Sequence, residues 1–283
     1  RLLWGTSDDW LTDENAMHVN GEVTMRYEGG SKNIGPCNYQ RGLYENGANI
    51  PGDDVWVVYS MSKEDIWISR IPVPMEKETD EYPTEKFNDV SSALDLKTWN
   101  TFSPSWAPVS IASFPSEENK SLSFSDKDPF DYAKAFKVFK ETEGNLNVSF
   151  KVLTKQNDHG RFEIDLGNTN RLAPVRIAFN ANGEVEVDHW KMTSVLTKYY
   201  PDQWNEVKLK INVKDNTFIV SVNGAVSPEW IFNSRHVDHL DRITFRTGKF
   251  RGISINPVDP EKDLPLDKEA KFYLDDMIFE IEK

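Results

Sequence analysis

The short segment "CNYQRG" carries the residue types best suited to sugar chemistry in the first part of the chain. It places Asn38, Tyr39 and Arg41 close together in a stretch, residues 29–54, that is rich in glycine and asparagine. An arginine can donate two parallel hydrogen bonds to a sugar carboxylate. A tyrosine hydroxyl can act as acid or nucleophile where a neighbouring charge lowers its pKa. Tyr39 and Arg41 are therefore catalytic candidates, and Asn38 and Arg41 substrate-binding candidates. The alternative is a surface loop held by ordinary polar contacts.

Histidine offers a second kind of chemistry. His18, in "ENAMHVNGE", is the only histidine of residues 1–100. An imidazole can serve as the general base that removes the proton beside a uronate carboxylate. His18 is thus the third catalytic candidate, with a histidine that only completes a turn as the alternative.

Metal-ligating residue types gather in two later segments. The segment "SRHVDHLDR" contains His236, Asp238, His239 and Asp241. In a strand His236 and Asp238 would share a face and His239 would not, whereas metal ligation needs convergence on one face. We therefore expect no metal site there. The segment "QNDHGRFEID" leaves open a structural Ca²⁺ held by Asp158, Glu163 and Asp165, because hard oxygen ligands suit that ion. Ordinary acidic turns are the alternative, and no other cofactor is expected.

Composition restricts the classes of partner. The 283 residues carry a formal net charge of −13, which argues against nucleic acid, since a phosphate backbone requires clustered lysine and arginine. No run approaches the roughly 18 apolar residues that span a membrane.

The single cysteine, Cys37, excludes an intramolecular disulfide. Nine tryptophans suit core positions, and some could form platforms on which sugar rings stack. The start at "RLLWGTSDDW", without methionine, suggests a mature or truncated product.

The chain reads as strands throughout. In residues 1–74 the strand-like runs are 22–29, 55–60 and 65–72, and residues 75–95 read as an acidic linker or strap. After it, hairpins are predicted at "VRIAFNANGEVEVDHW" and "WNEVKLKINVKDNTFIVSVNGA". Only residues 130–141 show some helical character. Residues 96–283 should form a two-sheet sandwich with these residues mostly buried: Trp204, Leu209, Ile211, Phe218, Val220, Phe245, Phe272 and Ile278.

The segment "YYPDQWNEVKLKINVKDNTFIVSVNGA", with "ITFRTG" and the closing "FYLDDMIFEI", resembles the concanavalin-like jelly-roll superfamily in its laminin-G-like branch. This resemblance covers residues 96–283 and implies a fold that hosts hydrolases, lyases, lectins and accessory domains. Glucanase members carry a Glu-x-Asp-x-x-Glu strand. Here "GRFEIDLGN" places Glu163 and Asp165 on one face without a third carboxylate, so an independent glycosidase in this part is not expected.

The stretch "GDDVWVVYSMSKEDIWISRIPVP" resembles the closing segment of sialidase-type (BNR-repeat) β-propellers in secreted polysaccharide-degrading proteins of Bacteroidetes. A propeller needs at least four blades of about 40–45 residues, so residues 1–74 would be only its C-terminal part. The expected fold is all-β: terminal propeller blades, residues 75–95 as linker, then a jelly roll.

The resemblances imply a secreted, periplasmic or outer-surface protein that acts on a polysaccharide or oligosaccharide, expected to be acidic. A glycoside hydrolase or polysaccharide lyase would hold its site in the propeller, whose remaining blades would be partners of this part of the chain. The alternative is a non-catalytic glycan-binding protein in which the jelly roll binds sugar or braces the propeller.

Overall fold

The computed structural model describes residues 84–281 apart from gaps at 94–95, 97–98, 130, 169–171, 235–236, 250–263 and 266. Before residue 84 it describes five strands: β1 (Leu3–Trp4), β2 (Met17–His18), β3 (Asn38–Gly42), β4 (Val55–Met61) and β5 (Asp65–Ile71). The chain divides into two compact units, residues 1–77 with 250–262 and residues 78–249 with 263–283. Among the described residues, no helix is long and apolar enough to cross a membrane.

The second unit consists of two antiparallel sheets. The first, called the β12 sheet, has the order β15-β14-β13-β12-β20-β10-β7. Its strands are β7 (Trp99–Phe102), β10 (Lys134–Thr142), β12 (Phe162–Gly167), β13 (Val175–Phe179), β14 (Glu184–His189), β15 (Met192–Lys198) and β20 (Leu240–Thr247).

The second sheet, called the β11 sheet, has the order β18-β17-β16-β11-β21-β9-β8, and β19 and β6 pair with its strands β17 and β21. Its strands are β6 (Thr84–Glu85), β8 (Val109–Ala112), β9 (Ser121–Asp126), β11 (Asn145–Thr154), β16 (Trp204–Asn212), β17 (Thr217–Val222), β18 (Ala225–Val226), β19 (Trp230–Ile231) and β21 (Ala270–Ile281). Every described pairing in both sheets is antiparallel, as expected of a jelly-roll sandwich.

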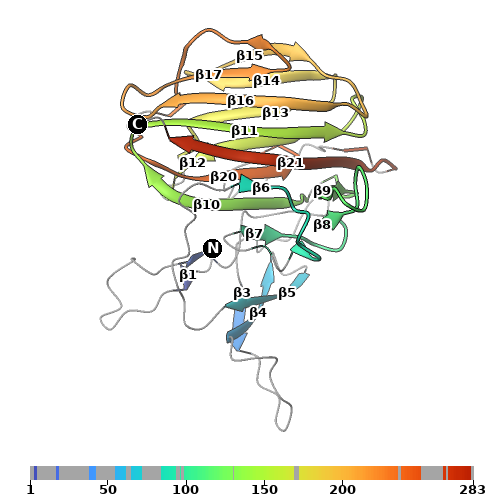
Figure 1. The fold of residues 1–283 in the computed structure, drawn as a ribbon. Coiled ribbons are helices and arrows are strands. Elements are labelled where there is room, and N and C mark those ends of the chain that lie inside the picture. Colours follow the sequence, from blue (N-terminus) through green and yellow to red (C-terminus); the bar gives the residue numbers. More distant parts are fainter. Residues whose placement is uncertain are drawn as a thin grey trace, which may run out of the picture. The chain divides into compact units, whose positions relative to one another are not determined.

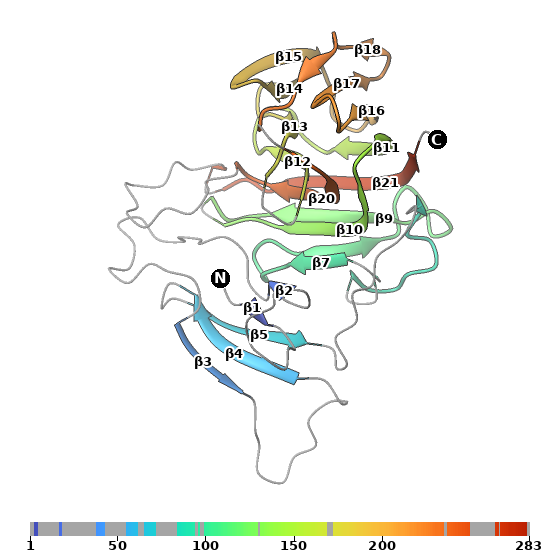
Figure 2. The same ribbon diagram turned by 90° about the vertical axis from the view of Figure 1, so that its left-hand side faces the viewer.

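The two sheets pack face to face, and the β11 sheet lies in front of the β12 sheet in Figure 1 (turned in Figure 2). Aromatic rings from both inner faces meet between them. Phe150 of β11 contacts Phe245 of β20 edge to face, with ring centroids 5.4 Å apart. Phe162 of β12 stacks on Phe272 of β21 at 4.8 Å. Burial of these rings removes large apolar areas from water and accounts for the cohesion of the sandwich.

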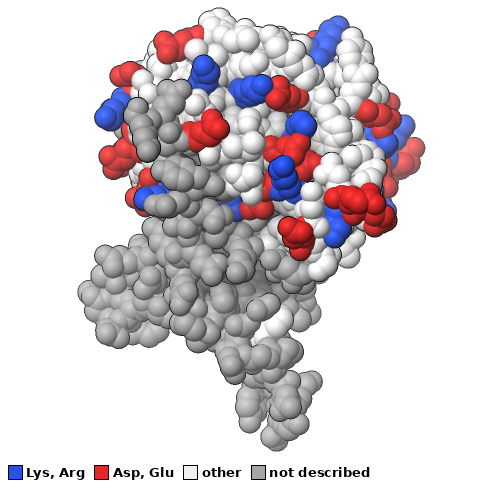
Figure 3. All heavy atoms as spheres, in the orientation of Figure 1, with Lys and Arg blue, Asp and Glu red and all other residues white. Residues whose placement is uncertain are grey.

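The outer side chains follow the alternation of the strands. In β16 the residues from Asn205 to Ile211 are alternately buried and exposed, which is the pattern of a strand with one face on the core. Figure 3, in the orientation of Figure 1, shows acidic and basic side chains interspersed on the face in view. Exposed pairs such as Lys208 with Glu206 (2.8 Å) belong to this pattern. The net charge is therefore spread rather than gathered by sign on this face.

Most of the predicted core is confirmed. Leu209, Ile211, Phe218, Val220, Phe245 and Phe272 are buried. The hairpins β13–β14 and β16–β17 have the predicted antiparallel pairing. Trp204, at the start of β16, is only half-buried. The prediction for Ile278 is wrong, because this side chain is 37% exposed.

A bulge in β21 explains the error at Ile278. Ser149 of β11 pairs with Ile278, but Lys151 pairs with Asp275, so β21 contains one residue more than its partner over this interval. Asp276, within the bulge, has φ 49°. Phe272 and Leu274 are buried before the bulge, and Met277 and Phe279 after it. The extra residue reverses which side chains face the core.

The helical character noted for residues 130–141 is not realised. Residues from Lys134 onward form β10, which pairs with β20 on one side and β7 on the other. Ala135, Lys137 and Phe139 are buried on alternate positions. Pairing on both edges and burial of this face override the local preference.

In the first unit the predicted strands at residues 55–60 and 65–72 are confirmed as β4 and β5. Strands β4 and β5 pair in register from Val55 with Ile71 to Met61 with Asp65. Residues 38–42, predicted within a loop, instead form β3, which pairs with β4. The predicted strand at 22–29 lies outside the described residues.

Candidate functional site: the charged face of the β12 sheet

Two rows of side chains cross the outer face of the β12 sheet. Directly paired residues of antiparallel strands point to the same face, so the register fixes each row. One row contains Phe102, Lys134, Arg246, Glu163, Ala178, Glu186 and Val195, and the other contains Asn100, Phe136, Thr244, Asp165, Arg176, Asp188 and Thr193. We call these two rows, with Arg161 just before β12, the charged face. The neighbours of its residues in sequence, such as Phe162 and Ile164, face the core.

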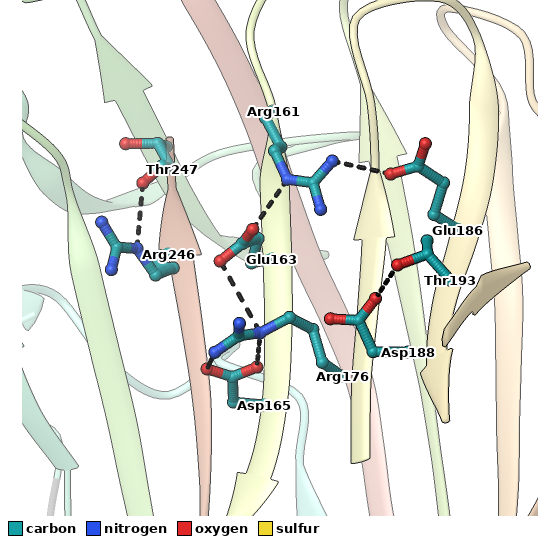
Figure 4. A network of polar contacts seen from close by, with 9 residues as sticks. All are labelled: Arg161, Glu163, Asp165, Arg176, Glu186, Asp188, Thr193, Arg246 and Thr247. Carbon is teal, nitrogen blue, oxygen red and sulfur yellow. Dashed lines mark hydrogen bonds and ion pairs between the residues drawn. The ribbon is translucent and has the colours of Figure 1, made fainter. Parts of the chain in front are cut away.

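A network of ion pairs links the middle of the charged face (Figure 4). Arg161 Nε donates to Glu163 at 2.7 Å, and its Nη1 donates to Glu186 at 2.8 Å. Arg176 donates to both oxygens of Asp165, at 2.6 and 2.8 Å, and its Nε lies 3.8 Å from Glu163. Glu163 is fully buried, whereas both arginines remain partly exposed. The network therefore has a buried centre and an accessible rim.

The rim retains groups for a ligand. Arg161 uses Nε and Nη1, and among the described residues no partner contacts its Nη2. Glu186 receives its hydrogen bond through Oε2, and Asp188 accepts from Thr193 through Oδ1 at 2.6 Å. The second carboxylate oxygens of Glu186 and Asp188 can therefore accept from hydroxyl groups. Donors and acceptors alternate over a short distance, as recognition of a polyhydroxylated ligand requires.

The opposite end of the charged face combines cations with aromatic rings. The guanidinium of Arg246 lies 4.3 Å from the ring centroid of Tyr132, and Tyr132 stacks on Phe102 at 4.8 Å. The ammonium of Lys134 lies 6.0 Å from the ring of Phe136. Such cation–π contacts hold charged groups against flat apolar surface. Arg246 and Tyr132 are fully buried, so this end is a packed cluster of cations and rings that supports the charged face from beneath.

Electrostatics keep the network charged. Burial by itself lowers the pKa of Arg176, but the hydrogen bonds to Asp165 and the charge of Glu163 raise it above its ordinary value. The pKa of Arg161 is likewise raised, because Glu163 and Glu186 outweigh burial. Burial raises the pKa of Asp165, and Arg176 opposes that rise. Both guanidinium groups thus remain donors at any physiological pH.

This arrangement favours binding over acid–base catalysis. A glycosidase uses two carboxyl groups with separate protonation states, of which one must carry a transferable proton. Here both oxygens of Asp165 accept from Arg176, and Glu163 is buried against Arg161. Neither carboxylate presents a free oxygen of the kind that proton transfer to a substrate requires. The described geometry is that of fixed, mutually oriented hydrogen-bonding groups.

The structure locates the candidates from the first unit only by strand. Asn38, Tyr39 and Arg41 lie in β3, with Asn38 paired to Ser60 and Arg41 to Val58. His18 ends β2, opposite Leu3. Their side chains lie outside the described residues, so the sugar chemistry assigned to them stays a prediction.

The three carboxylates considered for calcium have separate partners. Asp158 is exposed and contacts His159 at 2.5 Å, whereas Glu163 and Asp165 bind arginines. Calcium at this segment stays a prediction that the described contacts do not favour, because the arginines occupy the oxygens it would need.

Sequence reasoning found Glu163 and Asp165 but missed the carboxylates that accompany them. Glu186 and Asp188 come from β14, two strands away in the sheet. The signal was present in the alternation "EVEVDH", which places Glu184, Glu186 and Asp188 on one face. What could not be read locally was that this face lies beside that of β12.

Comparison with known proteins gives the family. Residues 99–268, more than half of the 283 residues, match the family model "Sialidase-like, CBM domain". A solved "Sialidase" structure shares 32% sequence identity over 91% of this chain, with a TM-score of 0.77. The chain spans only 24% of that sialidase. No curated protein matches the chain significantly.

A solved Crh5 transglycosylase matches more distantly, with 12% identity, a TM-score of 0.52, and coverage of 72% of this chain and 86% of its own. At that identity the likeness concerns the fold, a two-sheet jelly-roll sandwich. The match over residues 99–268 and the 32% identity to the solved sialidase show that the chain belongs to the family of sialidase-like carbohydrate-binding (CBM) domains.

Proposed function

We propose that the sandwich is a carbohydrate-binding module that holds a glycan on the charged face of the β12 sheet. The observation that carries this proposal is the rim formed by Arg161, Glu186 and Asp188, where oriented donors and acceptors remain free of described partners beside a buried ion-pair centre. Hydrogen bonds between charged groups and sugar hydroxyls contribute about 1.5–3 kcal/mol each. Trp190, in the turn that follows β14, is exposed and offers a ring for stacking.

The module would serve a larger glycan-processing protein. The likeness to a sialidase four times as long supports this view. The antiparallel sheet β3-β4-β5 of the first unit suits part of a propeller blade, which contains four antiparallel strands. On this proposal the remaining blades complete a propeller that holds a hydrolase or lyase site, and the protein works outside the cytoplasm or at the cell surface. Tyr39, Arg41, Asn38 and His18 remain its candidate site residues in this chain.

Glycan binding by the full 283-residue chain tests the module. Isothermal titration against sialylated, uronate-containing and neutral oligosaccharides should identify at least one ligand. Glu186→Gln and Asp188→Asn, at partly exposed positions, should each weaken binding of that ligand about tenfold, which corresponds to about 1.4 kcal/mol. Trp190→Ala reports on stacking in the same titration.

Lys210→Gln provides the matched control, because Lys210 is exposed on the outer face of β16 in the other sheet. It should bind as tightly as the original chain, and all variants should keep the same melting temperature. Full affinity in a Glu186→Gln/Asp188→Asn double variant would place the binding site elsewhere. Absence of binding across the panel would remove the proposal.

The catalytic part of the proposal needs the longer protein. There Arg41→Ala and Tyr39→Phe should each lower turnover of an anionic oligosaccharide at least about tenfold, or about 1.4 kcal/mol of transition-state stabilisation. His18→Gln joins them as a test of the general base. Full activity in all three variants would show that β2 and β3 do not contribute to the site.

A further inference from the structure

A bulge in β10 brings residues that are distant in sequence together at one end of the β12 sheet. Val138 pairs with Arg242 and Thr142 with Leu240, so β10 contains more residues than β20 over this interval. Within it Lys140 and Glu141 are both exposed, which breaks the alternation of the strand. The extra length places Glu141 beside Asp241, the residue of β20 between the two paired positions. Bulges of this kind frequently re-aim side chains at functional sites.

His239, immediately before β20, is oriented by a carboxylate. Its Nδ1 lies 2.8 Å from Oδ1 of Asp238. Because an ionised carboxylate only accepts, Nδ1 carries the hydrogen, and neutral His239 has its lone pair on Nε2. That Nε2 atom is buried and has no hydrogen-bond partner among the residues that the structure describes. A buried, unpartnered lone pair is costly in the absence of a ligand.

The unpartnered nitrogen faces carboxylate oxygens. Asp241 Oδ2 lies 4.0 Å from His239 Nε2, and one ligand atom each from Glu141, His239 and Asp241 lie within 4.8 Å of one another. Asp241 is buried and accepts from Arg242, through Oδ1 from Nε at 2.8 Å and through Oδ2 from Nη2 at 3.5 Å, so Oδ2 makes the longer of the two contacts. Two donor atoms on a tetrahedral zinc ion, at bond lengths near 2.0–2.1 Å, are about 3.3 Å apart. Metal binding would draw these atoms closer together, and the exposed Glu141 lies on the solvent side of the group.

We propose that Glu141, His239 and Asp241 form a binding site for one divalent transition-metal ion, with Asp238 as the residue that positions His239. One imidazole and two carboxylates suit Zn²⁺ better than Ca²⁺, which prefers oxygen alone. The ion would connect the β10 bulge to the start of β20 and stabilise that end of the β12 sheet. This proposal does not depend on the proposed glycan binding.

Titration of zinc into the full chain, after treatment with a chelator and its removal, tests the site. One Zn²⁺ per chain should bind with a rise in melting temperature, because a ligand that binds only the folded state stabilises it. His239→Gln and Glu141→Gln should abolish this event or weaken it at least about tenfold. Asp238→Asn should weaken it about 10–100-fold, as expected for loss of a partner that orients a ligating histidine.

The chain contains a matched control histidine. His159 also contacts the preceding aspartate through Nδ1, but its Nε2 lies 3.0 Å from the carbonyl oxygen of Glu269 and is therefore occupied. His159→Gln should bind zinc like the original chain. Because Glu141 is exposed, Glu141→Gln should fold like the original chain. A loss of zinc binding in this variant is therefore not a consequence of misfolding.

The outcomes separate the alternatives. Loss of the zinc-dependent stabilisation in His239→Gln and Glu141→Gln, but not in His159→Gln, supports the site. Equal zinc binding in all variants, or no stoichiometric binding at all, overturns it. Ca²⁺ that competes equally with Zn²⁺ in the original chain overturns the assignment to a transition metal.

Discussion

Lys137 is a lysine with no exposed side-chain surface in the middle of β10. Its ammonium lies 2.5 Å from Glu85 of β6 and 5.6 Å from the ring centroid of Trp99. Burial of a charge is tolerated only where a partner compensates the lost hydration. The pair therefore connects the segment around residue 85 to the sandwich, next to Phe87, which packs on Trp99 at 5.9 Å.

Removing the two partners of this pair should have unequal effects. Glu85→Ala leaves a buried ammonium without its carboxylate and should lower the free energy of unfolding by about 3 kcal/mol. Lys137→Met replaces the charge by an apolar chain of similar length and should cost no more than about 1 kcal/mol. Urea denaturation measures both. Equal losses would show that the pair is not what compensates the buried charge.

Asp126 makes stability dependent on pH. Burial raises its pKa to about 7. The charges of Asp131 and Asp128 add to this rise, whereas hydrogen bonds from Thr247 and the Asp128 amide reduce it. In the unfolded chain the pKa is about 3.9. Between these values the folded state keeps a proton that the unfolded state releases. The free energy of unfolding therefore falls as pH rises from about 4 to 7, by about 4 kcal/mol from this group.

Asp126→Asn should remove that dependence. Between pH 4.5 and pH 8 the original chain should lose stability that Asp126→Asn keeps. The free energy of unfolding of the variant should therefore rise relative to that of the original chain, as measured by urea denaturation at fixed ionic strength. Asp89→Asn, at an exposed position, controls for the loss of one charge. A difference that stays constant with pH would show that Asp126 titrates at its ordinary pKa in the folded chain.

At the scale of elements, three glycines in turns differ in whether backbone conformation or packing requires the absence of a side chain. Gly160 has φ +71°, and a Cβ there would lie 2.4 Å from Cβ of Ala270. Gly224 has φ +85°, and no atom of the described part of the chain lies within 4 Å of the position that a methyl group would take. Gly144 has the same open space in the described part and no positive φ. The connections β11–β12 and β17–β18 thus need glycine for different reasons.

Alanine at these positions should give a graded series. Gly144→Ala should be neutral or stabilise by up to about 1 kcal/mol, through the entropy of the unfolded chain. Gly224→Ala should cost about 1–2 kcal/mol for the left-handed conformation. Gly160→Ala should cost about 1–3 kcal/mol more, because a methyl group is forced into a packed site. Thermal and urea unfolding would show the order, and a Gly160→Ala no worse than Gly224→Ala would contradict the close approach of β21.

At the scale of the whole molecule, the described core belongs to the second unit. Its hydrophobic cluster extends from Phe87 to Phe279. The described strands of residues 1–74 form two small antiparallel sheets, β1-β2 and β3-β4-β5. Small isolated sheets without a shared core are marginal in water. The predicted boundaries, residues 1–74, 75–95 and 96–283, therefore lead to different expectations for the separate parts.

Residues 75–283 alone should be monomeric and unfold cooperatively, whereas residues 1–74 alone should be unfolded or aggregated. Near-ultraviolet circular dichroism during heating, with size-exclusion chromatography, measures both. A cooperatively melting 1–74 fragment would show that the first part closes its own core. Failure of 75–283 to fold would show that the sandwich depends on the preceding residues.

The sequence by itself determined the all-β class, the hairpins and most of the core. Alternation over residues 204–222 identifies the buried face of β16 and β17, because the side-chain period of a strand is local and unaffected by its neighbours. The same rule placed Glu163 and Asp165 on one face. It failed at Ile278, where one extra residue in β21 reverses the faces, and no local pattern announces which strand bulges.

Tertiary structure decided which of these faces meet. Glu163 and Glu186 belong to one network only because β12, β13 and β14 are adjacent in register. Glu141 and Asp241 lie far apart in the chain and face each other only because β10 pairs with β20 around a bulge. A single sequence gives the period of each strand, but strand order and register follow from packing both sheets over one core. Strand order and register therefore bring together the residues of the charged face and of the proposed metal site.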